Sequence, residues 1–140
     1  MTKTLRSPVI SPVVAIVGIG VLAWAAVPAA AMVSSRKFPT RSIEAGEVTV
    51  ELTPTRVDED SAVVKIVLDT HAVELDLNLR RGSSLKVDGL VWPTKSYRGD
   101  GPGGHHREGT LRFRAAGPPE GELRLRIRGL PEPVLARWQA

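Results

Sequence analysis

Strict alternation of apolar and polar residues is the feature that most limits what this chain can fold into. From Leu123 to Arg128 every second residue is apolar, and the residues between are all arginine. Successive side chains of a β-strand point to opposite faces of its sheet, so this pattern is typical of a strand with one face on a core and the other in water. Alternation of this kind predicts strands over residues 47–52, 72–79, 108–114, 123–128 and 134–138.

Other segments extend the same fold class. Residues 62–68 are an almost continuous β-branched run, which predicts a central strand covered on both faces. Short strands over 85–87 and 90–92 flank Asp88-Gly89, a hairpin dipeptide, and Pro54 and Pro93 are expected to end their strands. No helix is predicted beyond residue 33. The sequence thus predicts an all-β, antiparallel two-sheet sandwich of immunoglobulin-like or cupredoxin-like type.

The N-terminal segment predicts export. Lys3 and Arg6 precede an apolar run, and residues 29–31 are three alanines that fit a cleavage site. Residues 1–31 are therefore predicted to be a signal peptide or, because 13–33 is long enough to span a bilayer, a signal anchor. Residues 32–46 are predicted to be a polar tether and 47–140 the β-sandwich domain. The domain is expected to be secreted or periplasmic, or membrane-anchored through residues 13–33 alone.

Composition argues against several classes of protein. The chain has no cysteine, which excludes disulfides, thiolate chemistry and a lipid-modified cysteine. Its formal net charge is +4, of which Lys3 and Arg6 supply two, and only 4% of its residues are aromatic. Nucleic-acid binding is therefore not expected. No nucleophile lies in a recognisable catalytic context, and no phosphate-binding loop is present, so the pattern favours a non-enzymatic protein.

Residues 93–107 lack periodicity and predict a long loop, which in a domain of this size is usually functional or disordered. This loop holds the histidine pair His105 and His106, and His71 follows a predicted strand. Imidazole and carboxylate groups are ligands of Cu(II) and Zn(II), so these histidines predict a candidate metal site with Glu108 or Asp100 completing it. Adjacent residues of an extended segment point apart, so one histidine of the pair is expected to join His71.

The same loop has a second interpretation that needs no metal. Tyr97, Asp100 and Arg107 would then contact a partner, and the histidines would serve as local scaffold.

Five arginines on the predicted strands also admit two interpretations: Arg112, Arg114, Arg124, Arg126 and Arg128. They would form one cationic face for an anionic partner or lipid headgroups, or they would lie in solvent and pair across strands with Glu47, Glu51, Glu74 and Asp76. The second interpretation is favoured.

Residues 101–111, Gly-Pro-Gly-Gly-His-His-Arg-Glu-Gly-Thr-Leu, together with Asp69-Thr70-His71 and Asp88-Gly89, carry a family resemblance. In these motifs the chain resembles a family of small exported prokaryotic β-sandwich proteins of unknown function, in which a GGHH loop feeds a strand. The similarity spans roughly residues 47–138. It implies an extracytoplasmic β-domain with the three histidines in matching motif positions, and it implies no particular activity.

Two functions follow as hypotheses. The first is an exported, non-enzymatic interaction module whose glycine-rich His-His loop binds another extracytoplasmic protein. The alternative is an extracytoplasmic Cu(II)- or Zn(II)-binding protein that uses His71, His105 and His106, with Glu108 as a further ligand. The first is preferred because it requires less of the geometry.

Overall fold

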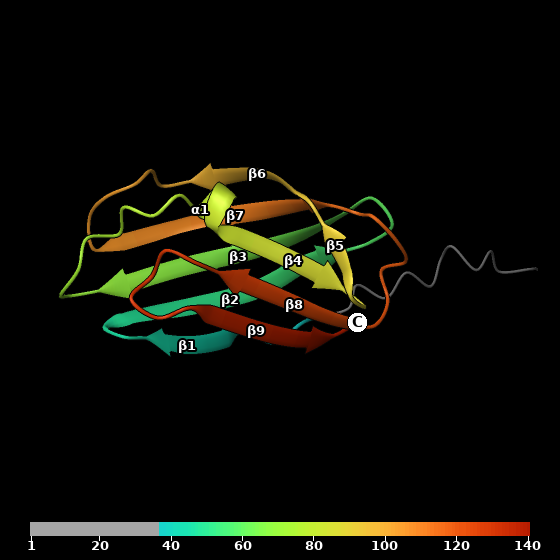
Figure 1. Ribbon diagram of the computed structural model, residues 1–140, viewed down its shortest axis with the longest axis horizontal. Helices are drawn as coiled ribbons and strands as arrows, with labels where there is room; N and C mark the ends of the chain where they lie inside the picture. Colours follow the sequence, from blue (N-terminus) through green and yellow to red (C-terminus); the bar gives the residue numbers. More distant parts are fainter. Residues whose placement is uncertain (1–36) are drawn as a thin grey trace, which may run out of the picture. The chain divides into compact units, whose positions relative to one another are not determined.

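Antiparallel β-sheets make up nearly all of the regular structure in residues 37–140, which are the residues that the computed structural model describes (Figure 1). The larger sheet, called sheet A, has the strand order β1 (Arg41–Ala45), β2 (Val48–Val57), β3 (Ser61–Thr70), β7 (His106–Arg114) and β6 (Thr94–Gly99). The smaller, sheet B, has the order β5 (Leu90–Trp92), β4 (Ser83–Val87), β8 (Glu122–Ile127) and β9 (Val134–Gln139). A single helical turn, α1 (Leu79–Gly82), precedes β4. The predicted all-β class with two antiparallel sheets is confirmed.

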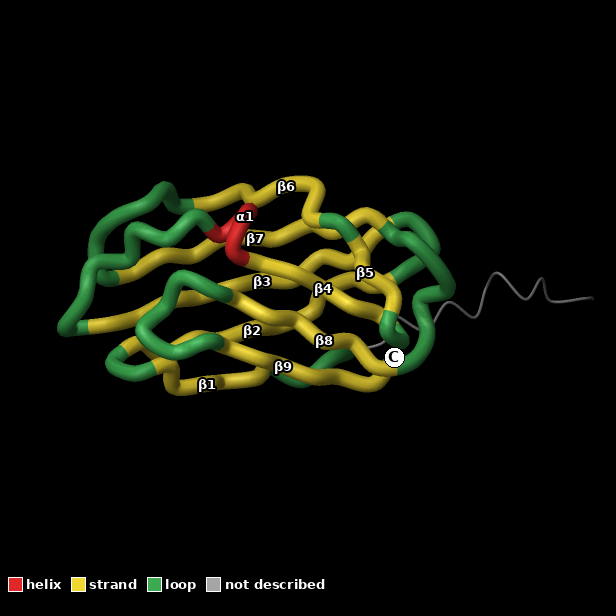
Figure 2. The backbone as a smooth tube through the Cα atoms, viewed as in Figure 1, coloured by secondary structure: helices red, strands yellow, loops and turns green. Residues whose placement is uncertain are grey.

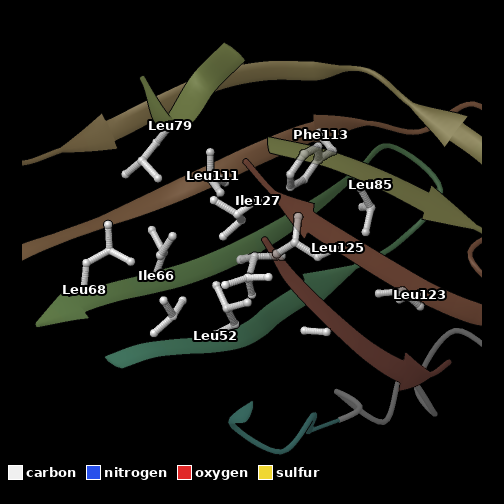
Figure 3. Packing of buried hydrophobic residues seen from close by; sticks show 14 of the residues in the cluster. Leu52, Ile66, Leu68, Leu79, Leu85, Leu111, Phe113, Leu123, Leu125 and Ile127 are labelled. Atoms are coloured by element: carbon white, nitrogen blue, oxygen red, sulfur yellow. The ribbon is translucent and has the colours of Figure 1, made fainter. Parts of the chain in front are cut away.

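The inward side chains of both sheets form one hydrophobic core (Figure 3). Alternation predicted this core correctly: Leu111 and Phe113 of β7, and Leu123, Leu125 and Ile127 of β8, are fully buried. Burying an aliphatic or aromatic side chain of this size contributes about 1.5–3 kcal/mol relative to leaving it in water. The core therefore provides the main stabilisation of the fold.

Strand β3 occupies the predicted central position, between β2 and β7. The prediction that it is covered on both faces was wrong. Val63 and Val67 are only partly buried and Lys65 is exposed, because sheet A has the core on one side and solvent on the other. A continuous apolar run therefore does not by itself establish burial on two faces.

The predicted strand over residues 72–79 is absent. Leu75, Leu77 and Leu79 are buried, as their alternation indicated, but residues 71–78 belong to neither sheet. The reason is topological: β3 lies in sheet A and β4 in sheet B, so the chain crosses between the sheets here. Asn78 then starts α1 by accepting a hydrogen bond from the backbone N–H of Arg81 at 3.0 Å.

The N-terminal boundary of the domain was also misplaced. Residues 41–45, predicted as part of the tether, form edge strand β1, which pairs with β2. Only Ile43 and Ala45 of β1 face the core, so the segment has almost no apolar signature. The predicted signal or anchor over residues 1–31 lies outside the described residues. Within residues 37–140, none of the helices has the length and apolar character needed to cross a membrane.

One proline and one loop need correction as well. Pro54 lies inside β2, beyond the last residue of β2 that pairs with β1, and the pairing with β3 shifts register after it. Residues 94–99, predicted as loop, form edge strand β6, and only residues 100–105 remain as a loop. The Asp88-Gly89 hairpin between β4 and β5 is confirmed. Pro93 ends β5 as expected.

Candidate functional site

The glycine loop, residues 100–105, lies at one end of the two sheets, beside the crossing segment 71–78 (Figure 2). Two backbone hydrogen bonds join the two segments: Leu75 N–H donates to Gly104 O at 2.9 Å, and Gly103 N–H donates to Leu75 O at 2.8 Å. A third joins the end of β3 to the loop, from Thr70 N–H to His105 O at 3.0 Å. Gly104 has a φ of 75°, a conformation that favours glycine. We call residues 69–78 and 100–108 the histidine end, because all three histidines of the chain lie there.

A buried arginine fixes the geometry of the histidine end. Arg107 is only 2% exposed, and its Nη1 donates to the carbonyls of Leu75 (3.2 Å) and Leu77 (2.7 Å). Its Nη2 and Nε donate to the carbonyl of Asp100 at 3.2 and 3.3 Å. The guanidinium therefore links the crossing segment to the loop. The prediction that Arg107 contacts a partner was wrong, because its side chain points inward from β7.

Tyr97 and Asp100 complete this support. The Tyr97 hydroxyl donates to the Asp100 carbonyl at 2.8 Å, and its ring centroid lies 5.6 Å from Arg107 Cζ, within range of a cation–π interaction. Burial raises the pKa of Tyr97, and the positive charge of Arg107 opposes that shift. The Asp100 carboxylate accepts from the backbone N–H of Glu108 at 2.9 Å. Both residues shape the loop, and their contact with a partner stays a prediction.

His106 belongs to a chain of ion pairs on the outer face of sheet A. Its Nδ1 lies 2.5 Å from Asp69 Oδ1, and its Nε2 lies 4.0 Å from Glu108 Oε2. Glu108 in turn pairs with Lys65 at 2.9 Å. Asp69 and His106 are register partners of β3 and β7, which is why they meet. The hydrogen bond to Asp69 and the attraction of its charge raise the pKa of His106.

The predicted metal ligands are not brought together. Among residues 37–140 no group of three or more histidine, cysteine, aspartate or glutamate side chains is arranged to hold one ion. His106 is on the outer face of sheet A and pairs with Asp69, whereas His71 follows the end of β3 and His105 precedes β7. Of the predicted set, only His106 and Glu108 approach each other, at 4.0 Å.

The five arginines do not share one face. Arg112 and Arg114 belong to β7 in sheet A, whereas Arg124 and Arg126 belong to β8 in sheet B, so the two pairs lie on outer faces that point in different directions. The predicted pairing with Glu47, Glu51, Glu74 and Asp76 was also wrong. Within the described part of the chain, the acid that pairs with one of these arginines is Glu122, which contacts Arg124.

Sequence reasoning missed two residues that matter here, Asp69 as the partner of His106 and Arg107 as a buried support. The alternation of β7 contained a signal for Arg107. Leu111 and Phe113 face inward, and every second residue before them does too, which places Gly109 and Arg107 on the inward face. For Asp69 there was no such signal, because its pairing depends on the register of strands that are 37 residues apart.

Comparison with models of protein families, with curated proteins and with solved structures finds no match for this chain. The resemblance to small exported proteins with a GGHH loop stays a prediction. The chemistry of the histidine end is therefore inferred from its own geometry.

Replacing Asp69 by asparagine is expected to lower the pKa of His106, because the hydrogen bond to a carboxylate and its charge are both lost. A raised pKa in the folded state means that the pair stabilises the fold fully below the unfolded pKa and ceases to do so as pH rises through the folded pKa. Both side chains are about half exposed, so the effect on stability is small. NMR titration of the imidazole measures the pKa of His106. Glu108→Gln is the matched variant, because the charge of Glu108 raises this pKa less than Asp69 does. An unchanged His106 pKa in Asp69→Asn would contradict the assignment.

Proposed function

We propose that this chain is an exported, non-enzymatic interaction module of immunoglobulin-like or cupredoxin-like type. Its histidine end would bind another extracytoplasmic protein. The observation that carries the proposal is the support beneath that end: a buried arginine that makes four hydrogen bonds to three carbonyls at the base of a surface loop.

Pre-organisation supports a binding role. A flexible loop loses conformational entropy when a partner orders it, and a loop already held by hydrogen bonds avoids that loss. Thr70, Leu75 and Arg107 hold the loop and the crossing segment together, while His71, His105 and His106 are exposed above them. The chain therefore presents histidines on a fixed scaffold.

Charge indicates what the partner would offer. The exposed acids of the histidine end are Asp69, Glu74, Asp76, Asp100 and Glu108. These five carboxylates outnumber the one arginine of the histidine end, Arg107, so this end is net acidic at neutral pH. A partner with exposed lysine or arginine side chains fits this surface at neutral pH.

The metal alternative has less support. It requires three ligands around one ion, and His71, His105 and His106 do not converge. A calorimetric titration of the full chain with Cu(II) and with Zn(II) separates the two hypotheses. We expect no saturable one-to-one binding at micromolar affinity. Such binding, abolished in His105→Ala/His106→Ala, would contradict the interaction module and favour the metal protein.

Site-specific photo-crosslinking tests the interaction module directly. A photoreactive amino acid at position 105 of the full chain, expressed with its own N-terminal segment, is expected to give a discrete crosslinked product. The same amino acid at position 53, on the outer face of sheet A in β2, is the control and is expected to give none. No product at position 105, or the same product at both positions, would overturn the proposed function.

A further inference from the structure

The outer face of sheet B is unusually rich in positive charge. Its exposed cations come from three neighbouring strands: Lys86 of β4, Arg124 and Arg126 of β8, and Arg137 of β9. Within residues 37–140, the ion pair made by these side chains is that of Arg124 with Glu122. We call these four residues the basic face. They outnumber the one carboxylate that pairs with them by four to one.

Three of these cations are in direct register. Lys86 is opposite Arg124 across β4 and β8, and Arg124 is opposite Arg137 across β8 and β9. Side chains directly opposite each other in an antiparallel sheet are neighbours, and like charges at such positions repel. This row is therefore unfavourable for the isolated domain. An anion that binds across the row would relieve the repulsion.

The basic face is also hollowed and carries apolar side chains. Ser84 and Leu135 join the four cations in lining a shallow depression. In the described part of the chain, 37–140, the large apolar side chains that are exposed all belong to sheet B. They are Leu90 and Val91 of β5 and Leu135 of β9. Val91 pairs with Lys86 and Leu135 with Arg126, so both apolar side chains neighbour cations. Basic residues mixed with apolar ones are typical of surfaces that lie on membranes.

The outer face of sheet A lacks this character. It also has cations, with Arg98, Arg112 and Arg114 on β6 and β7 and a depression that Arg56, Lys95, Arg112 and Arg114 line together with Asp60. Its exposed acids Asp69 and Glu108 pair with His106 and Lys65, and none of the exposed large apolar residues of the described chain belongs to this sheet. Among residues 37–140, cations without an ion pair are therefore combined with exposed large apolar side chains on sheet B and not on sheet A. If the net positive charge of the domain alone attracted it to a membrane, both outer faces would approach the membrane equally. If sheet B docks, only its outer face should approach.

The chain also enters the domain at the edge of sheet B. Trp138 of β9 donates its indole N–H to the carbonyl of Pro39 at 2.8 Å, and Arg41 Nε donates to the carbonyl of Arg137 at 3.1 Å. The apolar segment predicted to anchor the chain ends at residue 33, and the chain from there to Pro39 can reach at most about 20 Å. A membrane anchor would thus hold the β9 edge, with Arg137 and Leu135, close to a bilayer.

We propose that the outer face of sheet B docks on a membrane surface that contains anionic lipid headgroups. Phosphate oxygens accept hydrogen bonds from guanidinium groups, often in pairs, and a row of cations spreads over several headgroups. Leu135 and Val91 lie against the headgroup region in this arrangement. Nucleic acid does not fit the face, because none of the residues on it is aromatic and could stack with bases.

The absence of cysteine makes the test direct, because a single introduced cysteine carries the label at a known position. The full chain with Leu135→Cys, bearing an environment-sensitive fluorophore, is reconstituted into vesicles of phosphatidylcholine, with or without phosphatidylglycerol. We expect a blue shift of emission only with phosphatidylglycerol, weakened by added salt. The same fluorophore at Ser42→Cys, on the outer face of sheet A, is expected to show no shift.

Matched charge variants complete the experiment. Lys86→Gln/Arg126→Gln/Arg137→Gln is expected to lower the ratio of docked to free domain by about 100-fold, since each basic residue near an anionic surface contributes about fivefold. Arg98→Gln/Arg112→Gln/Arg114→Gln removes the same charge from sheet A and is expected to keep the shift. Three outcomes would overturn the proposal: an equal shift on neutral vesicles, equal loss in both variants, or a shift without vesicles that grows with protein concentration, which would indicate a second copy of the chain.

Discussion

Arg107→Met is expected to lower the free energy of unfolding by about 3–4 kcal/mol. Methionine fills much of the same volume but donates no hydrogen bond, so the carbonyls of Leu75, Leu77 and Asp100 lose their guanidinium donor. The Leu75 carbonyl keeps the Gly103 N–H and the Asp100 carbonyl keeps the Tyr97 hydroxyl, so these two lose only a charge-assisted hydrogen bond. The Leu77 carbonyl is left without this donor, and a buried carbonyl without a donor costs about 1–3 kcal/mol. Urea unfolding followed by near-ultraviolet circular dichroism measures the change.

The matched control is Arg112→Met, on the same strand but exposed on the outer face of sheet A. Its expected effect is within about 0.5 kcal/mol, as for most surface substitutions. Equal midpoints for the two variants would contradict the structural role of Arg107. The Arg107 variant is also expected to lose crosslinking from position 105, because the loop would no longer be held in place.

Gly99→Ala has the second large expected effect, about 3 kcal/mol of destabilisation. Gly99 has a φ of 150°, and a Cβ there would lie 2.4 Å from both the carbonyl oxygen of Glu108 and the Cα of Gly109. These are backbone atoms of the paired strand β7, so a side chain at position 99 forces β6 and β7 apart. Thermal unfolding should report a lowered midpoint.

Gly101→Ala is the control for this substitution. A Cβ at position 101 has nothing within 4 Å, so the expected change is below about 1 kcal/mol. A second alanine, Gly109→Ala, would place its Cβ 2.5 Å from the Tyr97 ring. That contact is with a side chain that can shift, so Gly109→Ala should fall between the other two. A different order of the three variants would contradict the geometry of this strand pair.

The fold was largely predictable because burial repeats every second residue wherever one face of a strand meets the core. Leu123, Leu125 and Ile127 in β8 show this directly. Edge strands were missed for the same physical reason: β1 and β6 bury few side chains, so their sequences contain little apolar alternation. The crossing segment 71–78 shows the opposite error, since alternating burial does not require a strand ladder.

The candidate site was less predictable, because it depends on which strands are neighbours. The sequence identified the histidines and the glycine loop, but it could not indicate that Asp69 faces His106 across two strands. It also grouped arginines of β7 and β8 on one surface, although the long connection between those strands carries the chain from one sheet to the other. The local sequence pattern indicates which face of a strand is buried. The pairing of strands that are distant in sequence determines which side chains become neighbours on that face.

The meeting of Pro39 with Trp138 has a consequence for chain connectivity. These residues are 99 positions apart, yet the indole N–H of Trp138 donates to the carbonyl of Pro39 at 2.8 Å. A short linker could therefore join the two ends of the domain, with new termini opened at the Asp88-Gly89 hairpin, where a Cβ at Gly89 would meet open space. Such a circular permutant is expected to keep both sheets, which would show that the fold does not depend on which strand is made first.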